Sequence, residues 1–184
     1  MKAQWSALRP HPTSSCEAIR RISVGIDLSE NPPDWRIRFR IEGKTSHLRL
    51  PLPVSARRND GLWQHTCFEA FLQADASASY YEFNFAPSGE WAAYRFSGRR
   101  IDRSSPEMPA LSVAFKRSAG CCELIADIPI PALPELARAS VVHAGLSAVV
   151  ESEDGSLSWW ALAHTSDKPD FHDPSTFALC VTAS

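Results

Sequence analysis

Four polar side chains stand among aromatic residues in the middle of the chain: Glu69, Glu82, Asn84 and Arg95. Carboxylates and amides exchange hydrogen bonds with hydroxyl groups, and aromatic rings stack on the apolar C–H face of a sugar. This combination of residue types is therefore suited to binding a polyol. The alternative is a structural network, in which one of the two glutamates pairs with Arg95 across a sheet or faces water.

Strands must position these side chains. Apolar and polar residues alternate with the two-residue period of a strand, so we expect three consecutive strands at residues 67–72, 80–85 and 91–96. One face of each is apolar, and the other mixes polar with aromatic side chains. Glu82 and Asn84 share a face, and neighbouring strands could place Glu69 and Arg95 beside them. This pattern is typical of a sheet with its core on one side and a ligand on the other.

Two catalytic arrangements are compatible with the residue types of this stretch. Glu69 and Glu82 could form a glycosidase pair, which needs carboxyl groups roughly 5–10 Å apart and one raised pKa. A small sandwich offers no deep cleft for such chemistry, so we expect no hydrolysis. His65 and Cys67 have the spacing of a Cys–His nucleophile, but no orienting acid or oxyanion device accompanies them. We expect a buried structural cysteine beside a loop histidine.

The tail holds the one crowded set of metal-ligand types: His164, Asp167, Asp170, His172 and Asp173. Their spacing is compatible with a hard cation or with zinc. An aspartate before a proline more often caps its own turn, however, and we expect that role here.

Composition sets limits on the class of protein. The chain has 184 residues, 44% of them hydrophobic and 22% charged, as in an ordinary soluble domain. A net charge of −2 gives no electrostatic reason to expect nucleic acid or a membrane as partner. Five cysteines without a CxxC motif, and an N-terminus without the apolar segment of a secretory signal, predict a cytoplasmic protein with reduced thiols.

The rest of the chain reads as more short strands, with one modest helix signal around residues 131–139. We expect strands or extended segments at residues 19–28, 35–42, 48–54, 111–116, 121–129, 141–151, 156–163 and 177–182. Residues 1–17 read as a loose lead-in, and Asn31 to Asp34 as a turn. The predicted fold is one all-β domain spanning residues 1–184, with its core at about 15–182: an antiparallel β-sandwich of about ten strands with at most one short helix.

Four segments carry a resemblance to a known family: WQHTCFEAFL, YYEFNFAPSGEWAAYRF, GLSAVVESEDGSLSWWALAH and KPDFHDPSTFAL. Together they resemble bacterial DOMON-like proteins, which are grouped with the family 9 carbohydrate-binding modules. The resemblance covers residues 15–182. It implies a sandwich whose concave face or edge loops hold a sugar or a haem, without catalysis by the domain itself.

The resemblance also implies site features. Sugar-binding relatives clamp a sugar between two tryptophans and usually carry calcium, and the candidates here are Trp63, Trp91, Trp159 and Trp160. Strand parity places Trp159 and Trp160 on opposite faces without deciding which faces the ligand. Haem-binding relatives use a methionine and a histidine, and Met108 has no evident histidine partner, so we expect neither haem nor another cofactor.

The predicted function is non-catalytic binding of a sugar-like small molecule, with a protein-interaction module as the alternative. The predicted ligand-binding residues are Trp63, Glu69, Glu82, Asn84, Trp91, Arg95 and Trp160.

Overall fold

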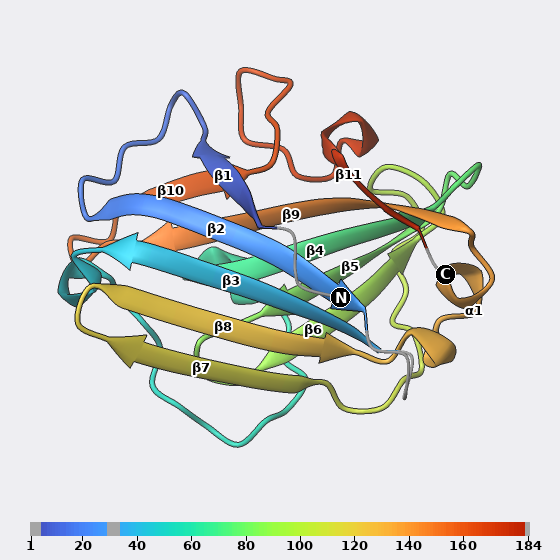
Figure 1. Cartoon of the computed structure of the whole chain (residues 1–184), viewed down its shortest axis with the longest axis horizontal. Coiled ribbons are helices and arrows are strands. Elements are labelled where there is room, and N and C mark those ends of the chain that lie inside the picture. Colours follow the sequence, from blue (N-terminus) through green and yellow to red (C-terminus); the bar gives the residue numbers. More distant parts are fainter. Residues whose placement is uncertain (1–4, 29–33, 183–184) are drawn as a thin grey trace.

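Eleven antiparallel strands form the framework of the computed structural model, which describes residues 5–28 and 34–182 (Figure 1). One layer runs in the order β2 (Ile19–Leu28), β3 (Trp35–Gly43), β8 (Cys121–Ile128) and β7 (Ser112–Ser118). The second runs in the order β6 (Trp91–Phe96), β5 (Tyr80–Phe85), β4 (Cys67–Ala74), β9 (Val141–Glu151) and β10 (Leu157–Ala161), with β11 (Leu179–Thr182) also paired to β9. The predicted β-sandwich is confirmed.

The first strand joins the two layers into one folded sheet. β1 (Ser6–Pro10) pairs with β10 on one side and with β2 on the other. The expectation of a loose lead-in is therefore wrong for this segment. Leu8 is buried, and the prolines that suggested a loop mark only its end, because Pro10 has no N–H to extend the ladder.

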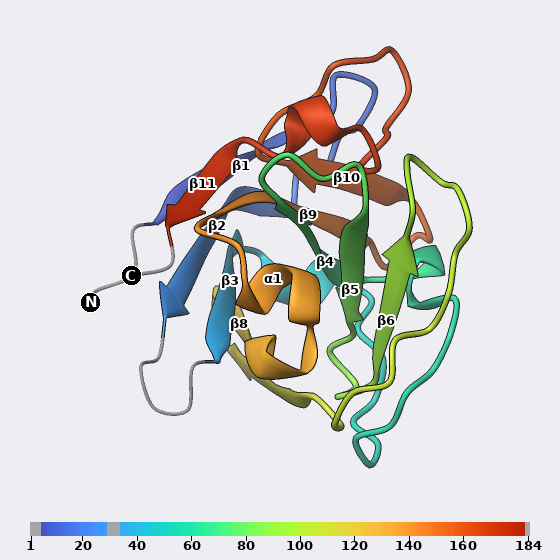
Figure 2. The same cartoon turned by 90° about the vertical axis from the view of Figure 1, so that its right-hand side faces the viewer.

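The main core fills the space between the layers, and the short helix α1 (Pro134–Ala137) closes one end of it (Figure 2). Alternation along β3 shows how the sequence builds this core. Ile37, Phe39 and Ile41 point inward and are fully buried, while the arginines between them point outward and pair with acidic residues.

A second, smaller apolar cluster lies on the outer face of the second layer, where the C-terminal segment crosses the sheet. Phe177 packs there between Phe71 and Tyr80, with ring centroids 5.7 Å apart in both pairs. Gly145 of β9 makes this contact possible, because a Cβ at that position would lie 2.5 Å from the Phe177 ring. The tail thus covers part of a sheet face that would otherwise be open.

Most other expected elements are confirmed. Gly155 and Gly120 adopt positive φ angles of 84° and 76° in the turns before β10 and β8. The proline-rich segment 48–54 forms a single isolated bridge at Leu48 and otherwise runs as an extended loop. Asn31 and the two prolines of the expected turn at residues 31–34 lie outside the described residues. Within the described parts, no helix has the length and apolar character needed to cross a membrane.

Candidate functional site

A cavity of about 440 Å³ opens on the outer face of the second layer. Outward-facing residues of the strands form its floor: Glu69, Glu82, Tyr94, Phe96 and Val149. Trp159 of β10 and Trp63, from the turn before β4, line it as well. The remaining lining comes from two irregular segments, with Arg100 and Arg103 from the loop after β6 and Pro169, Phe171 and His172 from the tail. The volume is in the range of small-molecule sites.

Two buried carboxylates occupy the floor. Glu69 and Glu82 are only 4% and 5% exposed, and they are diagonal neighbours because Glu69 lies opposite Asn84 on the paired strand. Ser147 donates a hydrogen bond to Glu69 Oε2 at 3.3 Å, and Asn84 donates to Glu82 Oε1 at 2.7 Å. Asn84 itself is fully buried, and its hydrogen bond fixes the orientation of Glu82.

Burial changes the protonation of the floor. It raises the pKa of Glu69 to about 8, and the nearby charge of Glu82 acts in the same direction. Burial also raises the pKa of Glu82. In contrast, burial lowers the pKa of His172 to about 4, assisted by the charge of Arg100. At neutral pH Glu69 is therefore protonated and His172 is uncharged.

Hydrogen bonds define how neutral His172 is oriented. Tyr80 Oη accepts the backbone N–H of Arg100 at 3.2 Å and lies 2.8 Å from His172 Nδ1, to which it can donate. The imidazole proton is then on Nε2, 3.6 Å from Glu82 Oε2. His172 thus presents an N–H toward the acidic floor without carrying charge.

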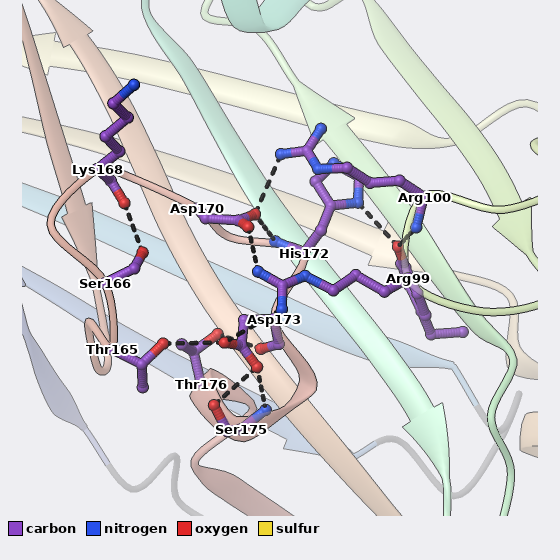
Figure 3. A network of polar contacts seen from close by, with 11 residues as sticks. Arg99, Arg100, Thr165, Ser166, Lys168, Asp170, His172, Asp173, Ser175 and Thr176 are labelled. Atoms are coloured by element: carbon purple, nitrogen blue, oxygen red, sulfur yellow. Dashed lines mark hydrogen bonds and ion pairs between the residues drawn. The ribbon is translucent and has the colours of Figure 1, made fainter.

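Ion pairs hold the tail against the cavity (Figure 3). Asp170 lies between Arg99 and Arg100, with N–O distances of 2.5 and 3.1 Å, and accepts the backbone N–H of His172 at 3.0 Å. Asp173 caps the turn at Pro174–Thr176 by accepting the N–H of Ser175. The predicted turn-capping role is confirmed, and the described residues contain no group of three His, Cys, Asp or Glu arranged for a metal.

The structure brings together part of the predicted ligand set. Trp63, Glu69 and Glu82 line the cavity, and Asn84 supports the floor. The other three predicted residues point away from it, on the opposite face of the sheet: Trp91, Arg95 and Trp160.

Each of these three has another environment. Arg95 binds Glu135 of α1, with Nε 3.1 Å from Oε1, so it does not join the polar set of the floor. Trp91 and Trp160 are buried in the main core at 5% and 6% exposure. Adjacent residues of a strand point to opposite faces, so Trp159, the neighbour of the predicted Trp160, faces the cavity.

Several lining residues were not predicted. Tyr94 and Phe96 alternate with Arg95, and their aromatic character on that face was a usable signal. Arg100, Phe171 and His172 lie in segments without periodicity, so the sequence pattern gave no direction for their side chains.

The Cys–His alternative is not supported by the geometry. His65 Nδ1 lies 2.8 Å from Glu151 Oε2, and the Cys67 thiol points to Asn84. Burial raises the pKa of Cys67 well above its usual value, which keeps the thiol protonated. The expected structural cysteine is confirmed.

No protein-family model matches the chain, and no curated protein matches it. Several solved structures do match the fold of the chain. A Bacteroides uniformis protein named a "putative carbohydrate-binding protein" superimposes with a TM-score of 0.64 at 13% identity, over 95% of this chain and 84% of that one. A family 9 carbohydrate-binding module from Caldicellulosiruptor kristjanssonii, in complex with cellotriose, gives 0.57 at 11% identity, over 95% and 80%. The chain shares their fold. At these identities, the binding role has to be argued from the cavity itself.

Proposed function

We propose that the protein is a non-catalytic carbohydrate-binding β-sandwich that holds a sugar or sugar-derived small molecule in the cavity. One observation carries the proposal: the same cavity contains two tryptophans and two buried carboxylates. The indole rings of Trp63 and Trp159 can stack on a sugar ring, while Glu69 and Glu82 can bond its hydroxyls. The shared fold with carbohydrate-binding modules supports it.

We infer a bacterial DOMON-like protein related to the family 9 modules, on the strength of the four sequence segments that carry this resemblance. Its five free cysteines suit a reducing compartment, and we propose a cytoplasmic location.

Binding without catalysis follows from how the carboxylates are placed. Glycosidase carboxylates flank the scissile bond, one on each side. Glu69 and Glu82 instead stand side by side on adjacent strands of one floor, so both approach a ligand from the same direction. We expect no release of nitrophenol from a panel of nitrophenyl glycosides, and turnover that disappears in Glu69→Gln would contradict the proposal.

The alternative of a protein-interaction module predicts a flat outer face around the glutamates. Glu69 and Glu82 lie in a hollow instead, which favours a small ligand over a protein surface.

Trp63→Ala is expected to weaken sugar binding about tenfold, because it removes a ring from the cavity wall. Trp63 is 52% exposed, so the free energy of unfolding should change little. The measurement is calorimetric titration with a panel of monosaccharides and disaccharides. Trp5→Ala is a matched control, since Trp5 is 43% exposed and lies outside the cavity. Equal affinities in both variants would remove Trp63 from the site.

A further inference from the structure

Most half-buried carboxylates of this protein have an arginine in contact. Among the pairs are Asp27 with Arg38 at 2.7 Å, Glu151 with Arg49 at 3.0 Å and Glu90 with Arg57 at 2.9 Å. Glu69 and Glu82 are exceptions. In residues 5–28 and 34–182, no lysine or arginine nitrogen comes within 4.0 Å of either carboxylate.

Ionisation of both groups is costly without a cation, because a buried carboxylate loses its hydration and gains no counter-charge. His172 Nε2 is near Glu82, but its low pKa leaves the imidazole neutral. Ser147 is the one described hydrogen-bond donor to Glu69, and it bonds only Oε2. Glu69 Oε1 has no hydrogen-bond partner among the described residues. Among their side chains, Trp91 Nε1 is the only unpartnered polar atom that is wholly enclosed, so Glu69 Oε1 must be accessible, and it faces the cavity.

We propose that the ligand of this cavity carries a protonated amine, as an amino sugar does, and that this amine binds between Glu69 and Glu82. The inference rests on the proposed function and names the class of sugar. The walls suit such a ligand, because the indole rings of Trp63 and Trp159 attract a cation as well as a sugar face.

The two arginines that line the cavity have partners other than the glutamates of the floor. Arg100 is engaged by Asp170, and Arg103 lies over the Tyr94 ring at 5.0 Å, so both act on the carboxylates from the rim. Tyr94 donates to Asp60, Tyr80 bonds His172, and the Cys67 thiol remains protonated. None of these groups places a positive charge in contact with the floor.

Binding of an amine changes the proton count. In the free protein at neutral pH, Glu69 is protonated, and burial raises the pKa of Glu82 beside it. An ammonium between them stabilises both as carboxylates, so the Glu69 proton passes to the buffer while the ammonium keeps its own. Glu69 alone is therefore expected to release about one proton per amine bound.

The test is calorimetric titration of the full chain at about pH 6.5, in two buffers with different ionisation enthalpies. The probes are glucosamine, galactosamine and mannosamine, each beside its neutral hexose and its N-acetyl derivative, together with cyclohexylamine. We expect one hexosamine to bind at least about tenfold more tightly than its neutral and acetylated counterparts, with proton release.

Isosteric variants locate the effect. In Glu69→Gln with Glu82→Gln, the preference for the amine should disappear and proton release should cease. Glu135→Gln removes a carboxylate that pairs with Arg95 outside the cavity, and it should leave the preference unchanged.

The outcomes separate the two proposals. A neutral hexose that binds as tightly as its hexosamine overturns the amine inference and leaves sugar binding intact. Binding of cyclohexylamine without any sugar supports the amine site and overturns the carbohydrate function. A panel in which nothing binds overturns both.

Discussion

Phe177→Ala is expected to lower the free energy of unfolding by about 3 kcal/mol, the scale measured when a buried phenylalanine is truncated. Phe177 is 4% exposed, packs between Phe71 and Tyr80, and lies directly over Gly145. Removing the ring leaves a void that the rigid sheet beneath it cannot fill. Urea unfolding followed by tryptophan fluorescence measures the change.

The same variant should weaken ligand binding, because Phe177 anchors the segment that carries Pro169, Phe171 and His172 to the cavity. Gly145→Ala probes this contact from the sheet side, since its Cβ would lie 2.5 Å from the Phe177 ring. Leu52→Ala is the control, because Leu52 is 82% exposed and should shift stability by less than about 0.5 kcal/mol. Wild-type stability and affinity in Phe177→Ala would show that the tail is held without this ring.

Raising the pH should destabilise the free protein through Glu69. Its pKa rises from 4.5 in the unfolded chain to about 8 in the fold, so the folded state binds the proton more tightly in this window, and stability falls as pH increases. His172 has the opposite effect on stability below pH 6.5. Its pKa falls from 6.5 in the unfolded chain to about 4 in the fold, so the unfolded state binds the proton more tightly and stability rises as pH increases toward 6.5. Burial also raises the pKa of Glu82, which does not oppose this trend, and the loss expected from Glu69 between pH 6.5 and 8 is about 2 kcal/mol.

Glu69→Gln should remove that slope, because glutamine keeps the shape and does not titrate. Urea unfolding at several pH values between these limits compares the two proteins. Glu135→Gln is the control, since Arg95 and Ser79 lower the pKa of Glu135 and keep it ionised throughout the window. Parallel stability curves for wild type and Glu69→Gln would contradict the raised pKa of Glu69.

Local alternation predicted the part of the site that depends on strand parity. Glu82 and Asn84 share a face because a strand repeats every two residues, and parity alone separates Trp159 from Trp160. Which of the two tryptophans faces the core depends on the register between strands. Trp160 lies opposite Ala148, which is itself buried in the main core. That register is set by pairing between strands that are far apart in the sequence, so the local alternation could not predict which tryptophan is buried.

The predicted role of Arg95 shows a second limit. It alternates with Tyr94 and Phe96, so parity already put it on the other face from these aromatics. Its partner Glu135 comes from a short helix some forty positions later, and no local pattern indicates that contact. Arg100 and His172 reach the cavity from irregular segments, where backbone turns decide the direction of side chains.

The strand that joins the two layers also constrains how the chain folds. Arg9 of β1 lies opposite Ala161 of β10, so β1 cannot complete its strand pairing until β10, about 150 residues later in the sequence, has been synthesised. During synthesis the sandwich cannot close until β10 has left the ribosome, and until then β1 and β9 each have an unpaired flank. Such distant pairing predicts slow folding for a chain of this size, with nascent strands that are prone to aggregate before the last of them arrives.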